Sequence, residues 1–167
     1  MILGMSLHTF VLVHTAISII AIIAGFIVMF GMLKSTRPGG LTALFLVLTI
    51  LTSGTGFLIP PLLTDKLLPS HIIGLLSEVL LLFACVALYA MKLSGSWRWI
   101  YAVTALLALY FNTFVLVIQS FLKIPALTAV APGNPPSGPV FAVVQGVVLV
   151  FFVLMIIGAV RRFRPTV

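Results

Sequence analysis

The chain has 167 residues, of which 62% are hydrophobic and 7% are charged, and its mean hydropathy is +1.36. Soluble domains carry about 25% charged residues, so this composition excludes a water-soluble fold and predicts a single transmembrane domain over residues 1–167. The formal net charge of +7 does not indicate nucleic-acid binding, because the basic residues lie between apolar runs and at the C-terminus, where membrane proteins carry loop charges.

The first apolar run covers about residues 7–33. A secretory signal peptide has a basic n-region followed by an apolar segment of about 7–15 residues. This N-terminus has no Lys or Arg before a much longer run, so we expect a retained first span.

Four further apolar runs follow, at about residues 41–60, 70–91, 98–122 and 139–160. Each supplies the roughly 20 residues that cross the hydrocarbon core of a bilayer. Turn-forming residues separate consecutive runs at 38–40, 60–61, 94–96 and 132–139. The sequence therefore predicts an all-α, integral membrane helical bundle of five transmembrane helices.

The distribution of Lys and Arg predicts how these helices are oriented. Lys and Arg in short loops stay cytoplasmic. Only Lys66, beside Asp65, and Lys123 lie on one side of the predicted bundle. The other side carries seven basic residues: Lys34, Arg37, Lys92, Arg98, Arg161, Arg162 and Arg164. We expect the N-terminus outside and the C-terminus in the cytoplasm.

Polar side chains gather in the outer half of every predicted span, whereas the inner halves are nearly all apolar. A polar group that faces lipid costs several kcal/mol unless it has a partner. We therefore predict that these groups turn inward around one polar pocket, open toward the outer face. The predicted site residues are His14, His71, Glu78, Asn112, Gln119 and Gln145.

Some of these groups could serve only to join helices, because interhelical hydrogen bonds stabilise membrane bundles. We favour this role for Ser18, Thr52, Ser53 and Thr55. For Asn112, Gln119 and Gln145, joining helices and binding a ligand remain open alternatives.

Small residues also predict close helix packing. Ala21 and Gly25 share a helix face with His14 and Ser18, and small residues on one face let two helices approach closely.

Glu78 and the lone Cys85 are the other reactive groups within the spans. A carboxylate inside a membrane is expensive and marks a functional site by default. The alternative is a protonated Glu78 that donates a hydrogen bond to a Gln or Asn of a neighbouring helix. Cys85 has no disulfide partner and is expected to be a small packing residue.

The histidines raise the possibility of a cofactor. His14 and His71, on parallel spans, could ligate a b-type haem or a transition metal such as copper, iron or zinc. Two features oppose haem: His14 lies about two turns deeper than His71, and no outer arginine is available for the propionates. His8 matches the depth of His71 but is on another face, where we expect an exposed interfacial residue. A quinone is a further option, because its carbonyls need donors such as His, Asn or Gln.

Several segments resemble a family of small uncharacterised bacterial integral membrane proteins. They are His14 with its following helix, TSGTGFLIP at 52–60, PSHIIG at 69–74, SWRWIY at 96–101 and, most specifically, YFNTFVLVIQSFLKIPALTAVAP at 110–132. The resemblance implies a multi-pass protein of the bacterial cytoplasmic membrane and a five-residue site: His14, His71, Asn112, Gln119 and Gln145. Glu78 is outside the family pattern, and GNPPSG at 133–138 departs from it. The family carries no known activity.

The leading hypothesis is a small membrane protein that binds a redox cofactor, metal or quinone in this outer pocket. The alternative is a non-catalytic accessory or scaffold subunit of a larger membrane complex, and a small transporter or proton-conducting protein is third. Besides the lipid bilayer, the expected partners are other membrane subunits or a second copy of the chain. No complete catalytic motif is present, so the sequence leaves open whether the chain is an enzyme. The outer segment at 123–138 is expected to be a lid, a partner-binding surface or an ordered connection.

Overall fold

The computed structural model describes residues 2–59 and 69–165, and in this part of the chain the structure is helical, with no strand. Five helices are long and apolar enough to cross a membrane. They are α1 (Leu7–Leu33), α2 (Gly39–Gly56), α3 (Pro69–Cys85) with the π-helical turn η1 (Val86–Ala90), α4 (Trp97–Lys123) and α6 (Pro139–Arg162). The short α5 (Pro125–Val130) connects α4 to α6. The all-helical prediction with five apolar helices is confirmed.

The helix ends follow the local sequence. The hydroxyl of Ser6 accepts a hydrogen bond from the Thr9 N–H and caps the start of α1. α2 ends at Gly56 instead of reaching residue 60 as predicted. Gly54 and Gly56 are poor helix formers, and the apolar residues that extended the predicted span lie in the turn after them. Residue 60 itself, with the predicted boundary at 60–61, is outside the described residues, as are Asp65 and Lys66.

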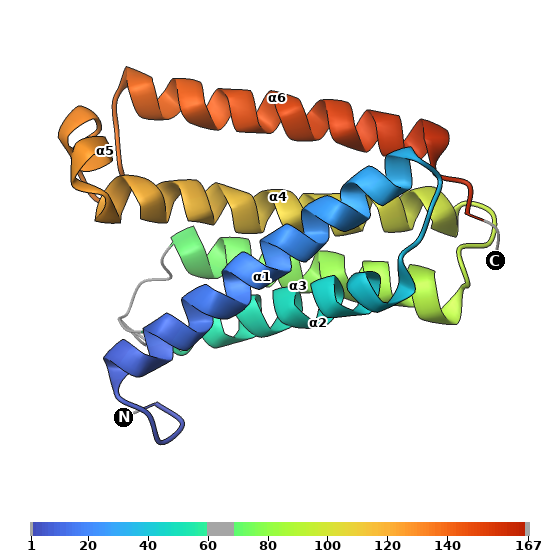
Figure 1. Ribbon diagram of the computed structural model, residues 1–167, viewed down its shortest axis with the longest axis horizontal. Helices are drawn as coiled ribbons and strands as arrows, with labels where there is room; N and C mark the ends of the chain where they lie inside the picture. Colours follow the sequence, from blue (N-terminus) through green and yellow to red (C-terminus); the bar gives the residue numbers. More distant parts are fainter. Residues whose placement is uncertain (1, 60–68, 166–167) are drawn as a thin grey trace.

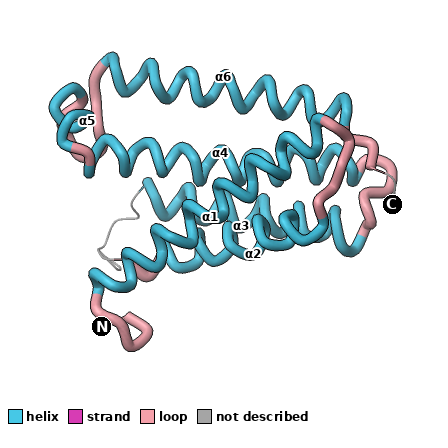
Figure 2. Tube along the Cα trace, viewed as in Figure 1, coloured by secondary structure: helices cyan, strands magenta, loops and turns pink. Residues whose placement is uncertain are grey.

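The helices are arranged with their connections at two opposite ends of the bundle (Figure 2). One end, here called the basic end, holds the α1–α2 connection, the η1–α4 connection and the C-terminus (Figure 1). All seven basic residues predicted to share one side lie at this end. The guanidinium of Arg98 donates to the Phe163 carbonyl at 2.9 Å, and the Arg164 N–H donates to the Ser35 hydroxyl at 2.8 Å. Lys123 and α5 lie at the opposite end, here called the α5 end.

α1 crosses the bundle obliquely, near α6 at the basic end and far from it at the α5 end (Figure 1). Phe26 of α1 lies beside Phe152 of α6, with ring centroids 5.9 Å apart. Gly25 marks the closest approach of α1 to α2 and α4: a Cβ on it would lie 2.5 Å from Leu109 Cδ1 and 2.9 Å from the Phe45 ring. With the fully buried Ala21, Gly25 forms the predicted small-residue face.

The apolar core extends from this crossing toward the basic end. It includes Met29, Phe45, Leu81, Leu106 and Phe152, and the half-buried Cys85 packs against it as expected.

This half of the bundle is less apolar than predicted, since Thr42, Tyr101 and Thr104 are buried in it. The Thr104 hydroxyl donates to the Ile100 carbonyl of its own helix, which lets a polar side chain sit in an apolar core.

Candidate functional site

Two adjoining cavities lie between the helices toward the α5 end. The first, the α1–α4 groove, has a volume of about 320 Å³ and runs between α1 and α4. The second, the α2–α3–α4 chamber, has a volume of about 360 Å³ and is lined mainly by those three helices. The residues that line both cavities, here called the junction, are His14, Thr52, Ile59, Asn112, Val115 and Gln119.

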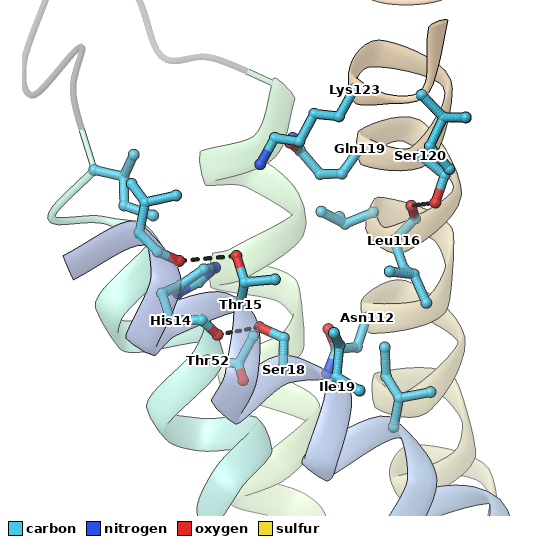
Figure 3. Close-up of a pocket in the computed structure, with 15 residues that line it drawn as sticks. His14, Thr15, Ser18, Ile19, Thr52, Asn112, Leu116, Gln119, Ser120 and Lys123 are labelled. Atoms are coloured by element: carbon cyan, nitrogen blue, oxygen red, sulfur yellow. Dashed lines mark hydrogen bonds between the residues drawn. The ribbon is translucent and has the colours of Figure 1, made fainter. Parts of the chain in front are cut away.

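Four of the six predicted site residues line these cavities. His14, Asn112 and Gln119 belong to the junction, and His71 lines the chamber only. Figure 3 shows His14 and Thr52 on one side of the groove, with Asn112, Gln119 and Lys123 projecting from α4 opposite them. These residues meet because α1 and α2 carry their polar groups at the same level as the last three turns of α4.

His14 is held in one orientation by α2. Its Nδ1 lies 2.8 Å from the Thr55 hydroxyl oxygen. That hydroxyl also contacts the backbone carbonyls of Leu51 and Thr52, which can only accept. The Thr55 proton is therefore directed at the α2 backbone, and its oxygen accepts from His14 Nδ1–H. This assigns the tautomer in which the lone pair is on Nε2, an atom that no described residue engages.

Thr52 and Asn112 carry buried polar atoms that lack a partner. Both residues are 9% exposed, and neither Thr52 Oγ1 nor Asn112 Nδ2 has a hydrogen-bond partner among the described residues. A buried polar atom left unpaired costs about 1–3 kcal/mol. Seven serine and threonine hydroxyls in the long helices avoid this cost by donating to the carbonyl four residues earlier; these are Thr15, Ser18, Thr49, Thr55, Thr104, Thr113 and Ser120. Thr52 departs from that pattern at the junction.

Gln119 and Lys123 extend the site toward the α5 end. They are one helical turn apart on α4 and point to the same side, above His14 (Figure 3). Both are exposed, and Lys123 places a positive charge at the mouth of the α1–α4 groove.

His71 faces the chamber from the start of α3. Its ring stacks on Phe57 with centroids 5.8 Å apart and planes at 29°. Gly74 makes room for Phe57, because a Cβ there would lie 3.2 Å from the Phe57 ring. His14 and His71 thus line one chamber, but the described residues contain no group of three His, Cys, Asp or Glu side chains that could hold a metal ion.

Glu78 and Gln145 line neither cavity. Glu78 is two turns deeper on α3 than His71, and its Oε1 faces the backbone of α2, 3.9 Å from where a Cβ on Gly54 would lie. Gln145 is on α6, and its Nε2 donates to the Phe114 carbonyl of α4 at 3.2 Å. The structure therefore places Gln145 as a connection between two helices.

Among the lining residues that were absent from the predicted site, three carry polar or charged side chains that the sequence analysis did not weigh as site residues. Ser77 of α3 is 3% exposed and lines the chamber, Asn134 reaches the chamber from the loop after α5, and Lys123 lines the groove. Lys123 could have been found from its spacing of four after Gln119 on one helix face. Asn134 carries no such signal, because it lies in a loop with no periodic pattern.

The segment from residue 123 to 138 connects α4 to α6 through α5 and packs back onto the end of α4. The Thr128 hydroxyl donates to the Phe121 carbonyl at 2.7 Å, which ties α5 back onto the end of α4. Ala131 and Pro136 are buried, and Ile124 lines the α1–α4 groove.

Comparisons of this chain with protein-family models, with curated proteins and with solved structures find no match.

Proposed function

We propose that the chain is a multi-pass membrane protein that binds a small amphipathic ring compound of the quinone class at the junction. One observation carries the proposal. Thr52 Oγ1 and Asn112 Nδ2, buried and without partners in the described residues, line the same space as His14, whose Nε2 is also unengaged. Polar groups that converge in an otherwise apolar pocket are typical of small-molecule sites.

The chemistry of the three groups matches a quinone and its reduced quinol. A quinone carbonyl accepts hydrogen bonds, which Asn112 Nδ2–H and the Thr52 hydroxyl can donate. A quinol hydroxyl also donates, and His14 Nε2 is an acceptor in the tautomer that Thr55 enforces. The same set of donors and one acceptor would bind either oxidation state.

The α1–α4 groove suits the apolar part of such a ligand. Its lining on α4 extends from Asn112 to Lys123, a length of about 16 Å at 1.5 Å per residue. Val11, Ile19 and Leu116 give it apolar walls. A ring at the junction could therefore continue into an alkyl or isoprenoid tail.

The cellular setting is part of the proposal. The basic end is the cytoplasmic end by the distribution of Lys and Arg, and the α5 end then faces outward. The resemblance to small bacterial membrane proteins supports the bacterial cytoplasmic membrane as the location.

A metal ion is less well supported, because His14 and His71 are two ligands without a third in the described residues. A haem would need only these two axial ligands, but every arginine lies at the basic end, away from where its propionates would be.

An accessory subunit is the second candidate. Of α6, only Gln145, Phe152 and Ala159 are buried, while Val143 and Val147 are 64% and 65% exposed. This apolar face would be covered by lipid or by a helix of a partner. A small transporter remains third.

The test is direct binding of a short-chain quinone to the chain in lipid nanodiscs, measured by calorimetry. Thr52→Val and Asn112→Leu should each weaken binding about tenfold, which corresponds to ~1.4 kcal/mol. Thr104→Val is the matched control, because Thr104 is also 9% exposed but bonds to its own helix and lines neither cavity.

The proposal fails if the wild type does not bind, or if the three variants bind equally well. A Soret band in the absorption spectrum of the purified protein would show that the bound ligand is haem and not a quinone. Purification with fixed partner subunits and no quinone binding would favour the accessory role.

A further inference from the structure

Apart from Thr52, which lines both cavities and has no partner among the described residues, the two cavities differ in how their serine and threonine hydroxyls are bonded. In the α1–α4 groove, the hydroxyls of Thr15, Ser18 and Ser120 donate to carbonyls of their own helices. In the chamber, the hydroxyls of Ser53 and Ser77 bond to no described residue. A hydroxyl that has already donated to its backbone tolerates an apolar neighbour, whereas a free hydroxyl needs water or a polar ligand.

The side chains that line the two cavities also differ: the outer wall of the groove is apolar, whereas the chamber is lined by more polar side chains. Ile19 and Leu116 of the groove are 43% and 36% exposed, and they lie on helices long enough to span a bilayer. The chamber instead reaches Asn134, an exposed residue of the loop after α5, and His71 at the start of α3. The groove therefore has an apolar side opening, and the chamber has polar groups from its depth at Ser77 to the α5 end.

We infer that the site has two ports: the α1–α4 groove admits a hydrophobic ligand from the lipid, and the chamber is a water-filled vestibule open at the α5 end. The junction residues His14, Thr52, Asn112 and Gln119 separate the two. The entry of a hydrophobic ligand through the groove rests on the proposed function. The water-filled vestibule does not, because it is argued only from the residues that line the chamber. The polar head of a bound ligand would meet water at the junction while its tail stays in the groove.

The experiment uses single cysteines in a Cys85→Ala background and a charged, membrane-impermeant methanethiosulfonate reagent. Ser53→Cys and Ser77→Cys are near-isosteric probes of the chamber, and Ile19→Cys and Leu116→Cys probe the groove. Three exposed positions serve as references: Ser137→Cys at the α5 end, Ser94→Cys at the basic end, and Val147→Cys on the apolar face of α6.

We expect the two chamber cysteines to react within about tenfold of Ser137→Cys, and from the same side of the membrane, because thiols react as thiolates in water. The groove cysteines should react at least ~100-fold more slowly, at the rate of Val147→Cys, since lipid suppresses thiolate formation. Ser94→Cys should react only from the opposite side.

Each outcome has a separate meaning. If neither chamber cysteine reacts faster than Val147→Cys, the vestibule is overturned, whatever the result of the quinone titration. If the groove cysteines react as fast as the chamber cysteines, the two-port arrangement is overturned, because both cavities hold water. If the chamber reacts as expected but no quinone binds, the vestibule stands and the proposed ligand falls.

Discussion

The Thr55 hydroxyl of α2 lies 2.8 Å from Nδ1 of His14 on α1 and accepts a hydrogen bond from the Nδ1–H. This single contact sets which ring nitrogen of His14 can act on a ligand. Gly56 lies against the same ring, since a Cβ there would be 3.7 Å from His14 Cε1. The ring is therefore held by α2 on two sides, with Nε2 left for the cavities.

Thr55→Val should weaken quinone binding about tenfold, the lower end of what loss of a histidine's orienting partner costs. Valine keeps the shape of threonine but cannot accept from Nδ1–H, so the ring loses its fixed tautomer. Calorimetry in nanodiscs would measure the change. Thr55→Ser keeps the hydroxyl and should bind as the wild type does; equal weakening in both variants would contradict the role of the hydroxyl.

Gly25→Ala should destabilise the bundle by about 1–3 kcal/mol, the usual effect of inserting a methyl group into a packed core. The new Cβ would meet Leu109 and Phe45 at less than 3 Å. The measurement is unfolding by SDS in bicelles. Gly146→Ala is the control, because no atom lies within 4 Å of its Cβ position, and it should leave stability unchanged. A neutral Gly25→Ala would show that α1 does not approach α2 and α4 so closely.

Gln145→Leu should separate helix packing from ligand binding. It removes the hydrogen bond from α6 to the Phe114 carbonyl, and such bonds contribute about 0.6 kcal/mol on average. Stability should fall by about that amount while quinone affinity changes by less than about twofold. A tenfold loss of affinity, comparable to that of Asn112→Leu, would place Gln145 in the site after all.

A reporter fused after Arg164 should be cytoplasmic, because seven basic residues lie at the end of the bundle where α6 ends. A fluorescent protein that folds only in the cytoplasm measures this directly. The matched insertion of alkaline phosphatase after Ser137, at the α5 end, should be active outside. The reverse pattern in the two fusions would invert the proposed topology.

The number and limits of the long helices could be predicted from the sequence, because apolar runs and the Pro and Gly residues between them determine where each helix crosses. The run at 7–33 matches α1 at both ends, and the run at 139–160 begins where α6 begins. α5 was not predicted as a helix, since its six residues are too few to show a period. The end of α2 was placed too late because Phe57, Leu58 and Ile59 prolong the apolar run without being helical.

The position of each polar residue along its helix could be predicted, but the direction in which its side chain points could not. His14, His71, Asn112 and Gln119 meet because their helices turn these faces toward one another. α6 is apolar on nearly all sides, so no pattern showed that Gln145 faces α4 on the far side of the cavities. Thr52 was expected to join helices. At the junction its hydroxyl instead has no partner within residues 2–59 and 69–165, a property that depends on neighbours from other helices.

Because α1 crosses the bundle obliquely (Figure 1), the width of the α1–α4 groove depends on the tilt of α1 relative to α4. α1 packs closely at Gly25, next to Leu109 and Phe45, and toward its N-terminus it runs away from α6 (Figure 1). The 14 residues from Gly25 to Val11 act as a lever of about 21 Å, so a tilt of ~5° about Gly25 would move the α1 wall of the groove by about 2 Å. A motion this small would admit or exclude a methyl-sized substituent while the core near the basic end kept its packing. For the ligand proposed above, the width of the groove would then depend on the packing of α1 at Gly25, and substitutions at this contact would change it without touching the ligand.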